Sequence, residues 1–302
     1  MIPVAPHPER ARGFAAAAGC YLLWGMVPIY WKQFGGIDSV EVIAHRSLWS
    51  LATLLALLFT TTGFGPVAAA LRDPRMAARS LLTSSLLAAN WLLYVHGVNT
   101  DRVSECSLGY FLVPLVNVAT GRLLLHETIT RLQWTAIAIA AAGVGWMVGQ
   151  QQETPWLAFG LAVTWGSYGV LRKRAPISAA AGLTVETIVT APIALGYLVF
   201  LEASGRGAFW GGDASTQCWL ASTGVVTAIP LWLFAYGAIR IRLATLGLLQ
   251  YIAPSVQLGL GIALYDEAVT SDRAIGFFCI WSGLAIYTID NLASMRRSRV
   301  MR

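Results

Sequence analysis

Charged residues are scarce in this chain. Asp, Glu, Lys and Arg make up 12% of its 302 residues, whereas hydrophobic residues make up 56%. Soluble domains carry roughly 25% charged residues, so a chain of this composition could not cover a folded surface with polar groups. The scarcity argues against an ordinary soluble domain and predicts that lipid is the solvent.

Cysteine and histidine are also few, and catalytic motifs are absent. The four cysteines show no C-x-x-C spacing, and the four histidines lie in different segments, which argues against a metal site or a disulfide framework. The sequence has no H-E-x-x-H, no G-x-S-x-G and no P-loop. We therefore expect no metal, no cofactor and no catalytic residue. An enzyme embedded in the membrane is the least favoured class, together with a pore or a sensor.

Long apolar segments are what the sequence has in abundance. A membrane helix needs about 20 mostly apolar residues, and ten segments meet this requirement. They are 13–31, 39–60, 79–99, 103–125, 132–149, 155–172, 181–201, 217–238, 243–265 and 273–292. The sequence therefore predicts an all-α polytopic membrane protein with ten transmembrane helices and short cytoplasmic tails at 1–12 and 293–302.

Lysine and arginine collect on one side of this predicted alternation. With the N-terminus inside, sixteen of the 21 basic residues fall in cytoplasmic segments, four fall outside, and Arg46 lies within a helix. By the positive-inside rule, this excess predicts a multi-pass bacterial inner-membrane protein with both termini in the cytoplasm. The same distribution explains the net charge of +6 without a nucleic-acid partner.

The sequence repeats itself at an offset of about 140 residues. The pairs Trp24-Gly25 and Trp165-Gly166 correspond. Further matches join Arg102, Pro114, Val116, Glu127 and Gly143 to Arg242, Pro254, Val256, Glu267 and Gly283, in that order. Five helices per unit is an odd number, so the second unit must enter the membrane upside down. The units 13–149 and 155–292 are thus predicted to be inverted repeats, a common construction of secondary transporters with a midplane site between the halves.

Six segments together carry a resemblance to a known family: Tyr21-Leu-Leu-Trp-Gly25, Ala44-His-Arg46, Asn90-Trp-Leu-Leu-Tyr94, Ser107-Leu-Gly-Tyr110, Pro114-Leu-Val-Asn117 and Leu248-Leu-Gln-Tyr-Ile-Ala-Pro254. They resemble the RarD family, in the EamA branch of the drug/metabolite transporter superfamily. The resemblance runs through nearly the whole chain. It implies two EamA-like five-helix repeats around a central cavity.

Ionisable residues inside the apolar segments are the first candidates for the site. Such a group costs at least ~2.5–3.5 kcal/mol at bilayer depth, so it usually faces a cavity or a partner. His45 and Arg46 lie within the second segment, and Glu186 falls on His45 at an offset of 141. We expect Arg46 and Glu186 to form either a charge pair that substrate disturbs or a static ion pair between the halves.

Aromatic and amide side chains complete the predicted substrate cavity. They are Asn90, Trp91, Tyr94, Tyr110, Asn117, Gln250 and Tyr251. Pro114 and Pro254 are expected to bend their helices. The rings of Trp24 and Trp165 are candidates for gating the cavity, although simple packing explains them equally well.

These features predict a secondary transporter that moves a small metabolite or drug by alternating access, and the resemblance to the drug/metabolite transporter superfamily implies export. Uptake of a small amino-acid-like or nucleoside-like metabolite is the alternative. The lipid bilayer and a small-molecule substrate are the expected partners, and a homodimer is left open. Coupling to the proton gradient through His45 or Glu186 is a hypothesis, with facilitated diffusion or exchange also open.

Overall fold

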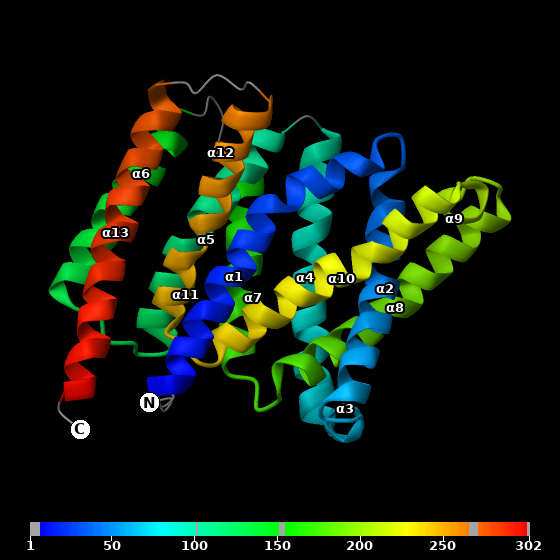
Figure 1. Ribbon diagram of the computed structural model, residues 1–302, viewed down its shortest axis with the longest axis horizontal. Helices are drawn as coiled ribbons and strands as arrows, with labels where there is room; N and C mark the ends of the chain where they lie inside the picture. Colours follow the sequence, from blue (N-terminus) through cyan, green and yellow to red (C-terminus); the bar gives the residue numbers. More distant parts are fainter. Residues whose placement is uncertain (1–6, 101, 151–154, 266–270, 301–302) are drawn as a thin grey trace.

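The computed structural model describes residues 7–100, 102–150, 155–265 and 271–300. The long helices are α1 (His7–Trp31), α2 (Ser39–Thr60), α4 (Pro74–Asn99), α5 (Val103–Leu124), α6 (Arg131–Gly149), α7 (Trp156–Lys173), α8 (Ala179–Ala203), α10 (Ala214–Ala238), α12 (Ile252–Tyr265) and α13 (Ser271–Val300) (Figure 1). Short elements connect them: η1 (Lys32–Phe34), α3 (Gly65–Arg72), α9 (Ala208–Gly211) and α11 (Leu243–Leu249).

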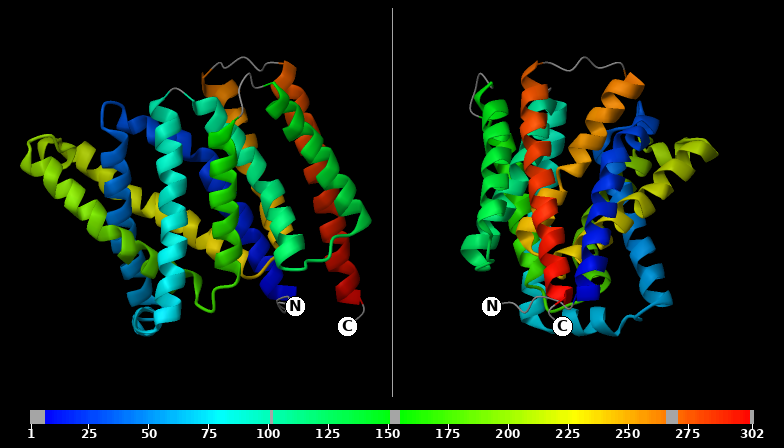
Figure 2. Two further views of the ribbon diagram at one scale, coloured as in Figure 1. Left: turned by 180° about the vertical axis from the view of Figure 1, so that it is seen from behind. Right: turned by 60° about the vertical axis from the view of Figure 1, so that its left-hand side comes forward.

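The two ends of the described chain lie at one face of the helix bundle. Helix α1 begins and α13 ends at this face, which we call the terminal face (Figure 2). The loop that joins η1 to α2, together with the starts of α7 and α13, lies at the opposite face. This arrangement is the one that an even number of crossings would give.

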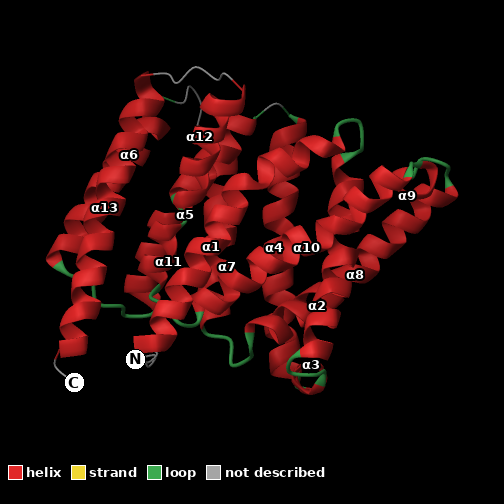
Figure 3. Ribbon diagram, viewed as in Figure 1, coloured by secondary structure: helices red, strands yellow, loops and turns green. Residues whose placement is uncertain are grey.

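The described residues form no strand, in agreement with the predicted all-α class (Figure 3). Seven spans in this part of the chain are long and apolar enough to cross a membrane, so the chain is a multi-pass membrane protein. Each of the ten predicted segments coincides with a helix, but the ninth is divided into α11 and α12. Ten crossings therefore stay a prediction.

The predicted tails are partly helical. Helix α1 begins at His7, and α13 continues to Val300. Polar residues at these ends find partners: Glu9 pairs with Arg12 and also accepts a hydrogen bond from Arg240 at 2.7 Å. Hydropathy marks only the part of a helix that lies in lipid, whereas backbone hydrogen bonds continue beyond it.

The two prolines predicted to bend helices have different surroundings. Pro114 lies inside the continuous helix α5. Pro254 lies in the first turn of α12, just after the interruption at residues 250–251. A proline cannot donate the backbone hydrogen bond to the residue four positions earlier, and for Pro254 that residue is Gln250, at the break.

Several helix pairings correspond when each helix of the predicted first repeat is matched with its predicted counterpart in the second. Helix α5 packs on α7 as α12 packs on α1, and α4 packs on α7 as α10 packs on α1. The pair α4 and α8 corresponds to the pair α10 and α2. Helix α6 packs along its own counterpart, α13.

Glycines allow the close approach of α6 and α13. A Cβ atom on Gly143 would lie 2.8 Å from the carbonyl oxygen of Gly276, and one on Gly283 would lie 2.6 Å from that of Ala136. These two contacts correspond at an offset of 140. Small residues let membrane helices pack closely, and van der Waals contact drives their association.

Gly143→Ala is expected to destabilise the protein, because the new methyl group must push backbone atoms of α13 away. Overpacking of this kind costs typically about 1–3 kcal/mol. Gly145→Ala, on the same helix with open space around its Cβ position, is the matched control. Thermal unfolding in detergent should show a lower Tm for Gly143→Ala alone. Equal Tm values for the two variants would contradict the packing argument.

Candidate functional site

A cavity of about 420 Å³ lies between α2, α4, α8 and α10. Its wall is mostly apolar, with Leu54, Leu87, Leu183 and Leu231 among the lining residues. A few hydroxyl groups and two charged side chains, Arg46 and Glu186, complete the lining. A mainly apolar concavity with a few polar groups is typical of small-molecule sites.

The cavity lies where α4 and α8 diverge. The two helices touch near the terminal face and separate toward the opposite face (Figure 2). At the contact, the Ser84 hydroxyl donates to the backbone oxygen of Glu186 at 3.0 Å. Farther along the helices the lining includes Leu92 and Ile193, whose side chains are 71% and 76% exposed. The cavity therefore opens at its side, between two apolar helix surfaces.

Arg46 is a buried cation at the cavity wall. Its guanidinium carbon lies 3.4 Å from the ring centroid of Trp91, a cation–π contact. No ion pair to Arg46 is formed within the described part of the chain, and its Nε atom has no hydrogen-bond partner there. The indole Nε1 of Trp91 is likewise buried without a partner.

Glu186, by contrast, is fully engaged. Its Oε1 accepts from the Thr83 hydroxyl at 2.8 Å and lies 3.4 Å from Arg172 NH1, and its Oε2 accepts from the Tyr168 hydroxyl at 3.1 Å. Arg172 also donates to the backbone oxygen of Ala179 at 2.7 Å. We call Glu186, Arg172, Tyr168 and Thr83 the Glu186 cluster; it ties together α4, α7 and α8.

Two smaller cavities share lining residues with the first one, which we call the central cavity. We call the one toward the opposite face the upper cavity and the one toward the terminal face the lower cavity. One of about 210 Å³ lies toward the opposite face, and its lining includes Arg46, Trp91 and Tyr94. Another of about 170 Å³ lies toward the terminal face, and its lining includes Glu186 and Arg79. Arg46 and Trp91 therefore stand between the central and upper cavities, and Glu186 stands between the central and lower ones.

The ion pair of Glu186 is formed with Arg172 and not with Arg46. The predicted charge pair is thus absent from this conformation, although both predicted members line the central cavity. His45 stacks on Phe209 at 5.1 Å between ring centroids, and its Nε2 lies 3.8 Å from Glu41. His45 therefore packs against the connection between α8 and α10.

The remaining predicted cavity residues lie mainly at helix contacts. Asn90 donates to the backbone oxygen of Leu161 and to the Thr164 hydroxyl, and so joins α4 to α7. The hydroxyl of Tyr251 donates to the backbone oxygen of Phe111. Six of the ten predicted cavity residues are not among those lining the three cavities: His45, Asn90, Tyr110, Asn117, Gln250 and Tyr251.

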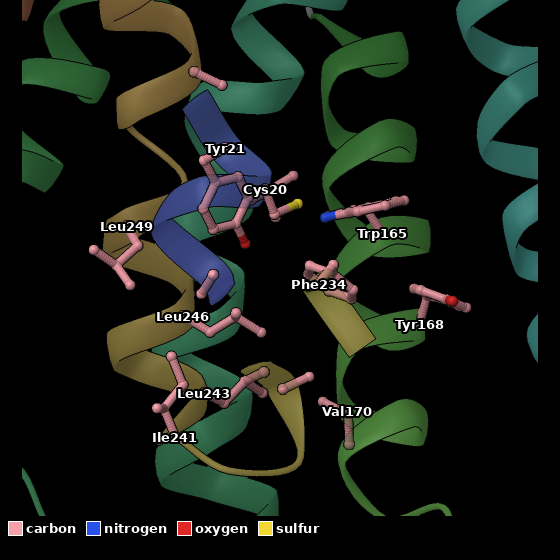
Figure 4. Packing of buried hydrophobic residues seen from close by; sticks show 14 of the residues in the cluster. Cys20, Tyr21, Trp165, Tyr168, Val170, Phe234, Ile241, Leu243, Leu246 and Leu249 are labelled. Atoms are coloured by element: carbon pink, nitrogen blue, oxygen red, sulfur yellow. The ribbon is translucent and has the colours of Figure 1, made fainter. Parts of the chain in front are cut away.

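Trp24 and Trp165 lie in contact, with ring centroids 5.4 Å apart. They belong to an aromatic group with Tyr21, Tyr168 and Phe234 that packs α1, α7 and α10 together. Figure 4 shows Tyr21, Trp165, Tyr168 and Phe234 of this group. Neither Trp24 nor Trp165 lines the central cavity. Tyr168 connects this aromatic group to the Glu186 cluster through its hydroxyl.

Sequence reasoning placed Arg172 among the loop charges and passed over Thr83 and Tyr168. Arg172 lies in the last turn of α7 and is 3% exposed. A Cβ atom on Gly182 would lie 2.1 Å from its NH1 atom, so the missing side chain at Gly182 leaves room for the guanidinium. An available signal was Gly182 itself, four residues before Glu186 and hence on the same helix face.

Glu127 lies in the loop between α5 and α6 and contacts residues of the second half. Its carboxylate accepts from the backbone N–H groups of Leu243 and Ala244 at the start of α11, and it pairs with Lys173 at 3.5 Å. Its predicted counterpart Glu267 lies outside the described residues.

Comparisons with a family model and with known proteins point to the same family. Residues 11–149 match the EamA-like transporter family. The chain is 39% identical to Protein RarD of Streptomyces exfoliatus, with 96% of this chain and 92% of that protein covered. It is 39% identical to the uncharacterized transporter YojE of Bacillus subtilis (97% and 99% covered) and 32% identical to Protein RarD of Escherichia coli (96% and 98% covered).

A solved crystal structure supports the fold. It matches this chain with a TM-score of 0.72 at 21% identity, over 93% of this chain and 98% of that one. The fold, the family match and the identities over nearly the full length agree. The chain therefore belongs to the RarD proteins of the EamA branch, within the drug/metabolite transporter superfamily.

Proposed function

We propose that this protein is a secondary transporter that exports a small organic substrate by alternating access. The single observation that carries the proposal is the position of Glu186. Its side chain lines both the central cavity and the lower one, and its carboxylate is bonded from two other helices. The Glu186 cluster thus closes the cavity toward the terminal face, while the cavity opens at its side, near Leu92 and Ile193 in the parts of α4 and α8 that approach the opposite face.

The proposal includes ten crossings in two inverted five-helix repeats. The reciprocal helix pairings support this arrangement, as do the matching contacts of Gly143 and Gly283. Trp24 and Trp165, which correspond in the two halves, touch each other. Residues related by a two-fold axis can meet only near that axis.

The two halves are arranged unequally, which alternating access requires. Helices α2 and α10 pack closely: a Cβ atom on Gly224 would lie 2.2 Å from the backbone carbon of Trp49. The corresponding pair, α4 and α8, is splayed around the cavity. If the halves exchanged conformations, α4 and α8 would close and α2 and α10 would separate, which would expose the site to the other face.

Proton exchange at Glu186 supplies an energy source. Protonation would remove the negative charge that holds Arg172, Tyr168 and Thr83 together. The charged groups that face this position across the lower cavity are Arg79 and Arg174. A proton that enters from outside and leaves to the cytoplasm would be exchanged for a substrate moving outward, which is export.

The orientation that we propose places the terminal face in the cytoplasm of a bacterial inner membrane. Arg79, Arg174, Arg240 and Arg242 lie at the helix ends of this face, whereas Arg206 lies in the connection between α8 and α9 near the opposite face. Basic residues favour the cytoplasmic side.

Cysteine accessibility tests both the closure and the orientation. In a background with Cys218 and Cys279 replaced by serine, Ser47→Cys reports the central cavity and Ser80→Cys the lower one. A membrane-impermeant maleimide should label Ser47→Cys in right-side-out vesicles and Ser80→Cys in inside-out vesicles. Labelling of both positions from the same side would overturn the closure at Glu186.

Transport itself is tested by comparing metabolites in cells and medium. Cells that express the intact chain are compared with cells that express an Arg46→Ala, Glu186→Gln double variant at equal membrane levels. A compound depleted from cells and enriched in medium only with the intact chain supports export. Accumulation inside cells would reverse the direction, and a chemically altered metabolite would replace the transporter by an enzyme.

A further inference from the structure

The central cavity presents hydrogen-bond donors that have no partner, but it has no free hydrogen-bond acceptor that carries a negative charge. Arg46 is 8% exposed, and its Nε lacks a partner, as does the Nε1 of Trp91. Arginine and the indole N–H can only donate. The one carboxylate in the lining, Glu186, is already bonded to Thr83, Tyr168 and Arg172. The wall therefore lacks an acceptor bearing negative charge near Arg46.

A buried cation without a counter-ion is unfavourable in a membrane protein, so a ligand that supplies a negative oxygen would be strongly preferred there. The guanidinium has a planar fork of donors that matches a carboxylate. Trp91 holds one face of this fork at 3.4 Å. One free cation balances one negative charge, and the paired Glu186 farther down the cavity disfavours a ligand with a second one.

The rest of the lining describes the body of the ligand. Leucine, isoleucine, valine and alanine side chains together form most of the wall, and the side opening is bordered by the exposed apolar residues Leu92 and Ile193. An apolar body can enter through such an opening from the bilayer. A sugar or a nucleotide would replace few of its hydrogen bonds to water, because four of the lining hydroxyls, those of Ser50, Ser84, Thr187 and Thr190, already donate to backbone oxygens.

Resting on the proposed function, we propose that the substrate of this cavity is an organic monoanion: an oxyanion, carboxylate in the first instance, carried on an apolar body. Arg46 binds the oxyanion, Trp91 orients the guanidinium, and the leucine-lined wall between α2, α4, α8 and α10 takes the body. The same headgroup chemistry occurs in a lipid phosphodiester, which is the second source of such an anion.

Binding to the purified, delipidated protein tests the inference without any assumption about transport. Isothermal titration calorimetry would compare 3-phenylpropanoate, indole-3-acetate and octanoate with their primary amides, which have the same shape but no charge. The intact chain should bind at least one acid about 10-fold or more tighter than its amide, a step that corresponds to one decade of Kd. Phosphatidylglycerol is titrated as the lipid arm.

Variants locate the effect. Arg46→Gln should remove the preference for acid over amide, and Arg46→Lys should keep part of it, because the charge remains but the fork is lost. Arg206→Gln removes an exposed arginine from the connection between α8 and α9 and should keep the full preference. Arg46→Lys and the amide series on the intact chain remain informative if Arg46→Gln folds poorly.

Each outcome decides the inference. Equal binding of acids and amides, no binding of any acid, or a preference that survives Arg46→Gln would overturn it. Binding of phosphatidylglycerol alone would overturn the metabolite source in favour of lipid. Acid binding at Arg46 without flux of the same acid in proteoliposomes would support this site while contradicting the proposed transport, so the two failures are distinguishable.

Discussion

Glu186→Gln is expected to slow export on the order of 10- to 100-fold and to remove its dependence on the proton gradient. The amide keeps the shape of the side chain but cannot balance the charge of Arg172, which is 3% exposed. Breaking a buried ion pair by removing one partner costs roughly 3–5 kcal/mol. This cost falls on the conformation in which the Glu186 cluster is closed, so the variant should populate that conformation much less.

The measurement is substrate flux in proteoliposomes with and without an imposed pH difference. Protonation no longer changes the charge at position 186 in the variant, so the flux should be the same at either polarity of the gradient. If Glu186→Gln retained the wild-type response to the gradient, Glu186 would not be the coupling group.

Glu105→Gln is the matched control for this variant. Glu105 is also buried and paired with an arginine, Arg102, at 2.6 Å, and it accepts from the backbone N–H of Leu157. It lies at the other end of the helices and does not line the central cavity. Its loss should lower Tm while the response of transport to the proton gradient persists.

The fold could be predicted closely from the sequence, because lipid imposes a simple rule. Backbone groups in hydrocarbon must be bonded within the segment, so each apolar run has to be a helix. The interruption at Gln250 and Tyr251 was the main departure. Hydropathy is insensitive to such a break, since the residues on both sides of it remain apolar.

Site residues could be predicted from the sequence only where a charged side chain lies inside an apolar segment, because burying a charge there costs free energy. Arg46 and Glu186 stand out in the sequence because a charge inside an apolar run is expensive, and both line the cavity. Arg172 did not stand out, since it precedes Lys173 and Arg174 and looks like the start of a loop. Only the packing of α7 against Gly182 shows that its side chain turns inward.

The roles of amide and aromatic residues were harder to predict, because the same residue types occur at helix contacts and in cavity walls. Polar side chains join membrane helices as readily as they line cavities. Asn90 and Tyr251 are bonded to backbone oxygens of neighbouring helices, whereas Trp91 faces the cavity from the residue next to Asn90. Sequence spacing places Asn90 and Trp91 on adjacent parts of one helix, and the neighbouring helices decide which of them meets the cavity.

Gly224→Ala is expected to shift the protein toward the conformation open to the terminal face. The new methyl carbon would lie 2.2 Å from the backbone carbon and 2.3 Å from the backbone oxygen of Trp49. Backbone atoms in the middle of α2 cannot move aside alone, so α2 and α10 must separate. Overpacking typically costs about 1–3 kcal/mol, which corresponds to a shift of roughly 5- to 150-fold between two states.

The same two cysteine variants, Ser47→Cys and Ser80→Cys, measure this shift through their rates of reaction with the impermeant maleimide. In Gly224→Ala, the Ser47→Cys position should react more slowly from outside, and the Ser80→Cys position should react faster from the cytoplasmic side. Gly196→Ala, in α8 with open space around its Cβ position, is the matched control and should leave both rates unchanged. A folded Gly224→Ala protein with unchanged rates would mean that the α2–α10 contact is not broken during the cycle, because the clash would then be absorbed without any change in access.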